Sequence, residues 1–304
     1  MKSDAPSFMQ KKFIYTLLAS ILMVVSSYGQ RHEIGAQLGM SNLVGDIGRT
    51  NYILQKPSGN FSDYGVPFYG SILYRMNFNP YQTVRFNLGY SHIQFIDNLA
   101  KEQYRRNRNL AGTNSVAELD VLFEYNFFPV NDEQKSLLSP YIFGGFGALL
   151  ASTPQLVIEH DFRRDSNGEA LAPSDAEDFE TAKSFSTAKN VTFAIPFGVG
   201  LKYKFNYNWA LFGEFMFRPT FSDSIDYSQI DEKSIKEKYN KDLPSTGSAN
   251  KSLLQETPYR DVADARAAVI IQNREIGNIN SKDWVNTISL GLSYSFGRPP
   301  CYCD

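Results

Sequence analysis

Apolar residues occupy every second position in several segments of the chain. Between Ile288 and Phe296, large apolar side chains alternate with serine and glycine. A two-residue period puts neighbouring side chains on opposite faces of a β-strand. The pattern predicts strands with one apolar face and one polar or small face. Eight segments fit it, although the facing of the fifth, which is rich in glycine, is ambiguous: 32–40, 69–78, 84–91, 117–127, 140–150, 191–205, 209–219 and 284–297.

The connections between these segments alternate in length. Three are short, at 79–83, 129–139 and 206–208, whereas four are long, at 41–68, 92–116, 151–190 and 222–283. Short turns on one side and long loops on the other are typical of outer-membrane barrels, whose tilted strands need about 9–11 residues to cross the bilayer. The sequence therefore predicts an all-β fold, an eight-stranded antiparallel transmembrane β-barrel of the OmpA-like type, with long extracellular loops, short periplasmic turns and both termini periplasmic.

A soluble β-sandwich or lipocalin-like barrel would show the same alternation with its apolar face inside. The loop asymmetry and the aromatic residues near strand ends favour the membrane barrel, because aromatic side chains gather at bilayer interfaces. These residues are Tyr203, Phe205, Trp209, Trp284, Tyr294 and Phe296. Composition agrees, with 18 Tyr and 23 Phe, and the mean hydropathy of -0.32 argues against a membrane protein built of helices. A net charge of -2 gives no general attraction to nucleic acid.

The first residues are typical of a secretory signal peptide. Lys11 and Lys12 precede an apolar run from Phe13 to Val25, and small residues follow before Gln30. We expect a signal peptide over 1–29 and a mature barrel over 30–304, in the outer membrane of a Gram-negative bacterium. A signal anchor is the alternative, and the start codon is either Met1 or Met9.

Both cysteines lie in the last four residues, at Cys301 and Cys303. Prolines 299 and 300 stop strand pairing, so we expect a short periplasmic tail that leaves the barrel. A Cys-x-Cys disulfide closes a small, strained ring. The two thiols are thus candidates for a disulfide tether to a partner, while pairing with each other or having no role remain the alternatives.

Charged side chains occur on the polar faces of the strands in balanced number. If the apolar faces meet lipid, these charges converge in a lumen just wide enough for side chains to fill. We expect them to pair as a packed polar core, because unpaired buried charge is costly. An ion pathway or proton relay is the alternative. The predicted network comprises Glu33, Arg75, Arg85, Glu118, Asp120, Glu124, Lys202, Lys204, Glu214 and Arg218.

The sequence favours a protein that is not an enzyme. The three histidines are His32, His92 and His160, and Ser91 next to His92 must face the opposite side of its strand. The long loops carry no metal or phosphate motif, so we expect no cofactor, no small-molecule substrate and no nucleic acid. Within the last long loop, 223–243 is predicted to be a solvated loop that could hold a short helix. The segment 259–275 is predicted to be either a helix or a hairpin that prolongs the barrel.

The stretch "EIGAQLGMSNLVGDIG" (Glu33 to Gly48) resembles PorG-like outer-membrane proteins, and Asn42 to Gly48 is its most discriminating part. A second stretch, Ile195 to Ile230, is also similar to that family and includes Thr220 to Asp223. The resemblance implies a non-enzymatic anchor or assembly subunit of the type IX secretion and gliding motility machinery. It implies the lipid bilayer and periplasmic PorK/PorN ring components as partners. Alternatives are a generic OmpA-like barrel for membrane integrity or surface-loop adhesion, and a barrel enzyme.

Overall fold

The computed structural model describes residues 31–297, apart from 54, 58–59, 132–136, 163–178, 240–256, 273–275 and 279–280. The predicted signal peptide, Cys301 and Cys303 lie outside the described residues.

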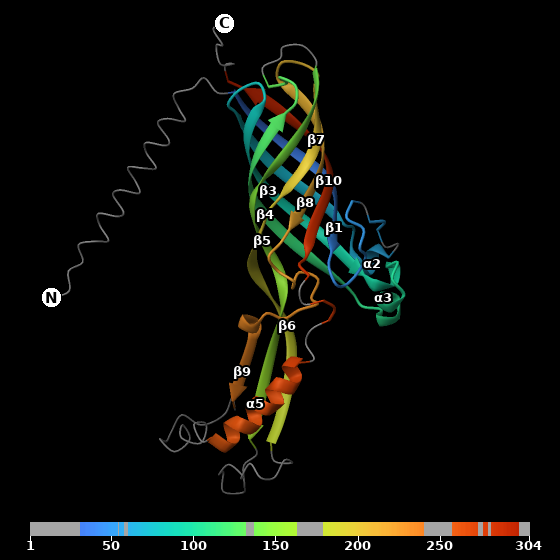
Figure 1. Ribbon diagram of the computed structural model, residues 1–304, viewed down its shortest axis with the longest axis vertical. Coiled ribbons are helices and arrows are strands. Elements are labelled where there is room, and N and C mark those ends of the chain that lie inside the picture. Colours follow the sequence, from blue (N-terminus) through green and yellow to red (C-terminus); the bar gives the residue numbers. More distant parts are fainter. Residues whose placement is uncertain are drawn as a thin grey trace, which may run out of the picture.

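Eight antiparallel strands form a closed ring (Figure 1), so the predicted barrel is confirmed. Each strand pairs with its neighbours along the ring, and β1 pairs with β10 to close it. His32 lies opposite Phe296, so the first strand begins where the last one ends. We call this end, which carries the short connections, the turn end, and the opposite one the loop end. The strands are β1 (Arg31–Val44), β2 (Phe68–Asn77), β3 (Gln82–Ile96), β4 (Ala111–Asn126), β5 (Leu137–Phe162), β7 (Phe197–Lys204), β8 (Trp209–Pro219) and β10 (Trp284–Phe296).

The outer wall of the barrel is apolar. Leu38, Phe146 and Leu290 are 74%, 76% and 69% exposed, and each belongs to a strand whose alternate residues are buried. A continuous apolar surface of this kind is stable against lipid rather than water. Tyr and Phe gather at the turn end, where the ring of Tyr81 stacks on Tyr125. The alternation of the sequence thus places the apolar residues against the bilayer, as predicted.

Strand β5 continues far beyond the barrel wall. Its pairing with β4 ends at Leu150, but its pairing with β6 (Phe179–Ala194) runs on to Phe162. Twelve further residues in strand conformation span about 40 Å. The predicted long loop over 151–190 is therefore wrong over much of its length. The predicted strand 191–205 is also divided, because the chain leaves the ladder at Ile195 and Pro196 before β7 begins.

The extension carries a small structure of its own, which we call the arm (Figure 1). Strand β9 (Ile235–Tyr239) pairs in parallel with β5, and helix α5 (Thr257–Gln272) packs against them. Apolar side chains that contact one another form its core: Leu156, Ile158, Ile230 and Ala267, with Ile235, Ile270 and Ile271 packed against them. The helix confirms one of the two predictions for 259–275 and rules out the hairpin.

The remaining long connections hold short helices at the loop end. They are α2 (Phe61–Tyr64), η1 (Asp97–Leu99) and α3 (Gln103–Arg108), whereas η3 (Glu232–Ser234) directly precedes β9 in the arm. The segment from Asp223 to Ser228 is mostly buried, so the prediction of a solvated loop is wrong there. Its apolar Ile225 is fully buried, which explains the difference. Among the described residues, no helix combines the length and the apolar character needed to cross a membrane.

Candidate functional site

The barrel interior is filled by charged side chains. All ten charged residues of the predicted network point inward and are at most 3% exposed. Five of them, including Arg75, Arg85 and Glu124, have no exposed surface at all. The interior at this level is a packed polar core.

Two arginines and two glutamates form the centre of the network. The Nε atom of Arg75 lies 3.0 Å from Glu124, and a terminal nitrogen of Arg85 lies 2.8 Å from the same carboxylate. Glu214 accepts hydrogen bonds from both guanidiniums, at 3.2 Å from Arg75, and from the Tyr141 hydroxyl. The five groups come from five different strands, so they tie opposite walls together. Pairing of this kind offsets the cost of removing charge from water.

The network continues toward the turn end through Glu33. Its carboxylate accepts hydrogen bonds from Lys202 at 3.2 Å and from Asn77 at 3.0 Å. Beyond it, Lys204 and Arg31 both donate to the backbone carbonyl of Asn131, at 3.4 and 2.7 Å. This carbonyl, which belongs to a short connection, covers the turn end of the lumen.

Toward the loop end, Arg218 pairs with Glu118 at 2.7 Å. Glu118 also accepts a hydrogen bond from the Tyr69 hydroxyl at 2.8 Å. Asp120 accepts one from Asn87 at 3.2 Å, and Asn87 also donates to Glu118 at the same distance. The structure therefore joins the predicted charges into a chain of contacts along the lumen.

Inward aromatic rings are the component that the sequence analysis missed. Each central arginine lies over one ring: Arg75 over Phe212 at 4.3 Å, and Arg85 over Phe143 at 4.8 Å. A guanidinium over an aromatic face is stabilised by the negative charge of that face. Phe143 lies in the glycine-rich segment of ambiguous facing, where Gly144 and Gly145 interrupt the alternation. Tyr141, two residues earlier on the same face of the strand, is the signal that could have indicated the inward position of Phe143.

Above the charges, the loop end of the barrel is closed by apolar side chains. Ile47 from the first long loop and Ile225 from the last one pack among inward residues of the strands. The strand residues of this cluster are Leu43, Ile93, Phe95, Val116, Leu149, Ala151, Ala194 and Val285. Among the described residues, this apolar cluster fills the loop end of the lumen beside the polar core.

Buried aspartates hold the two loops in place by accepting backbone hydrogen bonds. Asp226 accepts from the N–H of Ile47 at 2.8 Å, which joins the first and last loops. Asp283 accepts from the N–H of Ile225 at 2.8 Å. Asp46 accepts from the Ser281 hydroxyl at 2.9 Å. Carboxylates that satisfy otherwise unpaired N–H groups organise loops that lack regular ladders.

Burial and neighbouring groups shift the pKa values of the loop-end aspartates. Burial, together with the nearby carboxylates of Asp46 and Asp226, raises the pKa of Asp223 to about 7. Burial, with a smaller contribution from Asp46, also raises the pKa of Asp226. Burial and the nearby Asp226 carboxylate raise the pKa of Asp283 well above its usual range. Asp97 is the opposite case. Although burial opposes ionisation, hydrogen bonds from Arg108 and from backbone N–H groups lower the pKa of Asp97.

The histidines lie outside the lumen network. His32 contacts the Tyr74 hydroxyl at 2.8 Å, and His92 contacts the Tyr64 carbonyl at 3.0 Å. Ser91 is fully buried on the inner face, so it faces away from His92 as predicted. The side chain of His160 lies outside the described residues. Among the residues described, no group of three or more His, Cys, Asp or Glu is arranged to hold a metal ion.

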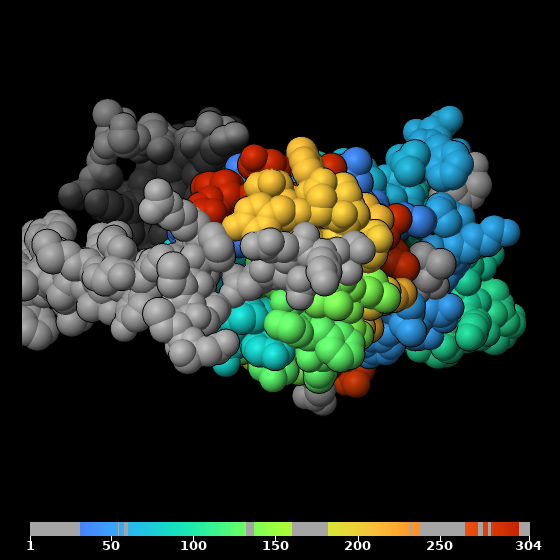
Figure 2. All heavy atoms as spheres, turned by 90° about the horizontal axis from the view of Figure 1, so that it is seen from above, coloured from blue at the N-terminus to red at the C-terminus, as the bar shows by residue number. Residues whose placement is uncertain are grey.

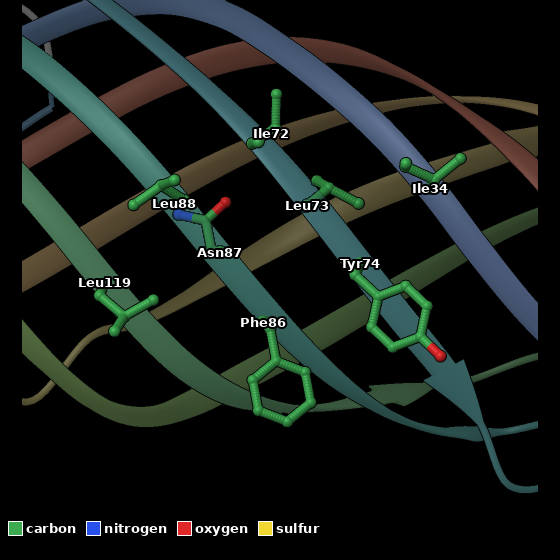
Figure 3. A pocket seen from close by; sticks show the side chains of 8 residues that line it. All are labelled: Ile34, Ile72, Leu73, Tyr74, Phe86, Asn87, Leu88 and Leu119. Carbon is green, nitrogen blue, oxygen red and sulfur yellow. The ribbon is translucent and has the colours of Figure 1, made fainter.

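A hollow of about 210 Å³ lies on the outer wall, not in the lumen (Figure 3). Its rim is formed by apolar side chains that are exposed on neighbouring strands, among them Ile34, Ile72 and Leu88. In the membrane, lipid acyl chains border this hollow.

The closed ring, the apolar wall and the filled interior define a small transmembrane β-barrel of the outer-membrane type. The chain belongs to the family described as "Domain of unknown function (DUF6089)", whose model matches residues 11–174. No curated protein matches the chain.

Three solved structures are similar to the chain in part. The attachment invasion locus protein Ail of Yersinia pestis is 11% identical, with 88% of this chain and 98% of that chain covered and a TM-score of 0.36. OprG of Pseudomonas aeruginosa is 9% identical, with 89% and 97% covered and a TM-score of 0.36. Neisserial surface protein A is 12% identical, with 88% and 97% covered and a TM-score of 0.35.

Proposed function

We propose that the protein is a non-enzymatic anchor or assembly subunit of the type IX secretion machine. It would lie in the outer membrane of a Gram-negative bacterium, with both termini in the periplasm, and bind periplasmic ring components of the PorK/PorN type. One observation carries the proposal: the lumen is filled by paired charges and apolar packing, so the barrel offers binding surfaces rather than a passage. A filled barrel suits a part that holds other components at the membrane.

The arrangement of the two PorG-like stretches supports this proposal. Asn42 to Gly48 and the residues after Thr220 are far apart in sequence, yet Asp226 binds the backbone of Ile47 directly. Gly45 lies so close to Asp226 and Asp283 that a Cβ atom there would meet their oxygens at 2.5 and 2.3 Å. The stretches that resemble the family therefore form one structural unit.

Ring components would meet the short connections of the turn end. Two of these turns are fixed by their own asparagines, since Asn79 accepts from the N–H of Gln82 at 2.8 Å and Asn206 accepts from that of Trp209 at 2.8 Å. Rigid turns lose little conformational entropy on binding. The proposed contact comprises 79–83, 129–139, 206–208 and 297–304.

Site-specific photo-crosslinking in native membranes tests the side of contact. A photoreactive residue in place of the exposed Gln82 should give an adduct with a ring component, whereas the same residue in place of Ser186 on the arm should not. Adducts with a ring component from Ser186 alone would contradict the proposed contact.

The tail cysteines provide a second test of the same proposal. If Cys301 or Cys303 tethers a ring component, a non-reducing gel of whole membranes should show a higher-mass band. This band should disappear with reductant and in the C301S/C303S double variant. An unchanged band pattern and unchanged ring association in that variant would leave the tail without a tethering role.

Binding through the loop end is a second candidate function, and the arm favours it. The arm extends about 40 Å beyond the barrel wall and has its own apolar core, which is more structure than loop closure requires. Joining Gln155 to Ser186 by a short turn, and replacing 233–275 by a flexible linker, would remove it. If the variant without the arm secretes normally but no longer binds at the cell surface, that result would favour this second function.

A further inference from the structure

Two asparagines on the outer wall of the barrel are buried where lipid-facing side chains are expected. Asn42 of β1 and Asn286 of β10 lie directly opposite each other in the ladder. Both share the outward face with Leu38 and Leu290, which are 74% and 69% exposed. Yet Asn42 and Asn286 are only 6% and 1% exposed. Something covers the outer wall at this level.

The first long loop provides the cover, because it folds back over the outer wall. The backbone carbonyl of Tyr52 accepts hydrogen bonds from Asn286 at 3.0 Å and from Asn42 at 3.4 Å. The Tyr52 ring packs edge-on against Trp284 at 5.2 Å, and Trp284 contacts Phe197 of β7 at 6.2 Å. We call residues 49–53 together with Gln55 and Lys56 the collar. Unlike Ile47, which packs into the mouth, the later part of the first long loop with α2 stands beside the barrel (Figures 1 and 2).

The collar presents apolar groups and cations together. Tyr52 and Ile53 are 45% and 57% exposed. The Arg49 guanidinium donates to the backbone carbonyl of Lys56, so the two ends of the collar lie close together. Lys282, which is exposed, precedes Trp284 by two residues.

We propose that the collar binds phosphate groups of lipid headgroups in the membrane leaflet at the loop end. Tyr52 and Ile53 continue the lipid-facing wall beyond Trp284 and Phe197 at the loop end, which places them at the interface between acyl chains and headgroups. Arg49 and Lys56 then stand at headgroup level, where a guanidinium forms paired hydrogen bonds to phosphate and an ammonium adds a point charge. Continuity with the lipid-facing wall selects a headgroup over free phosphate. The proposal requires only membrane insertion and does not rest on the secretory role.

Fluorescence quenching in reconstituted vesicles tests it. The chain has two tryptophans, so Trp209→Phe leaves Trp284 as the sole reporter beside the collar. This full-length variant is placed in phosphatidylcholine vesicles that contain a minor fraction of phosphatidic acid. Bromine, which quenches tryptophan, is carried on the phosphatidic acid in one sample and on an equal fraction of phosphatidylcholine in the other. Stronger quenching by the brominated phosphatidic acid is the expected result.

Charge-neutral variants then assign the effect to the collar. Arg49→Gln with Lys56→Gln should lower the relative affinity for phosphatidic acid by roughly fivefold per cation. Lys101→Gln with Arg106→Gln, beside and within α3, removes the same charge and should change it little. A gel shift between unboiled and boiled samples verifies that each variant is folded. Equal quenching by the two brominated lipids, equal losses in both double variants, or relief of quenching by inorganic phosphate would overturn the proposal.

Discussion

Glu214 is the residue on which the lumen network converges. It is 2% exposed overall and accepts hydrogen bonds from Arg75, Arg85 and Tyr141. Two arginines that share this carboxylate come from neighbouring strands, whereas Glu214 lies on the opposite wall. Its negative charge therefore connects the two sides of the barrel.

We expect Glu214→Gln to destabilise the folded barrel by about 3–5 kcal/mol, because it leaves buried guanidinium charge uncompensated. Urea unfolding in lipid vesicles, followed by tryptophan fluorescence, measures the free energy of unfolding. Asp63→Asn on the exposed surface of α2 is the matched control and should change it by less than about 0.5 kcal/mol. A Glu214→Gln barrel as stable as the unaltered protein would contradict the role given to this charge.

Gly39 is required by close strand approach. A Cβ atom at this position would lie 2.0 Å from the backbone carbonyl oxygen of Ile288, on the strand that closes the barrel. At Gly70 the nearest atom is the flexible end of Leu38 at 3.4 Å, an ordinary contact. We expect Gly39→Ala to reduce the fraction of folded barrel on an unheated gel, while Gly70→Ala folds normally. Equal folding of the two variants would show that β1 and β10 can separate without cost.

At the scale of elements, the arm has an apolar core distinct from that of the barrel. Its core joins Leu156 and Ile158 of β5 to Ala267 of α5, and these contacts lie beyond the last pairing of β5 with β4. Local stability of this kind can be lost without unfolding the remainder.

We expect Ala267→Asp to expose the arm to protease without altering the barrel, because a charge would be buried in the arm's apolar core. Val269→Asp, on the same helix but 60% exposed, should leave the arm resistant. Limited proteolysis reports cleavage of the arm, and an unheated gel then reports whether the barrel is still folded. Loss of the folded barrel in Ala267→Asp would mean that the arm and barrel fold as one unit.

The loop end should become less stable as pH rises. The folded pKa of Asp223 is about 7, above the unfolded value of about 3.9, so the folded state binds this proton more tightly. The resulting stabilisation is complete below about pH 4 and is lost as pH rises through 7. We expect Asp223→Asn to increase hydrogen-exchange protection of the Ile225 amide at pH 8 but not at pH 4. Greater protection at pH 4 alone would contradict a raised pKa of Asp223 in the folded state.

The sequence predicts the strands and the inward charges because both depend on a local two-residue period. It cannot predict the arm as readily. Residues 151–162 follow the glycine-rich part of β5, and Leu156 and Ile158 become buried only through contact with a helix about 110 residues away. The aromatic side chains that contact Arg75 and Arg85 were missed for a related reason. An inward Phe212 looks like a lipid-facing residue until the register of its strand is fixed.

For the whole molecule, the filled lumen determines the transport behaviour. We expect the purified protein to insert into planar bilayers without steady single-channel conductance, because groups with no exposed surface occupy the level of Arg75 and Arg85. The recordings require parallel evidence of insertion from an unheated gel. Reproducible conductance steps at low voltage would contradict a packed interior and favour the ion pathway instead.

The pairing of β1 with β10 also determines when the barrel can form. Ser293 donates to Glu33 across 260 residues of sequence, so these two strands meet only after nearly all of the intervening chain is available. Contacts between such distant positions slow folding, because the entropy of closing the ring is lost before the contacts stabilise it. Until then, both strands have open edges that can pair with other chains. The polypeptide therefore depends on being kept apart from its neighbours between export and closure, and that interval is when it is most prone to aggregate.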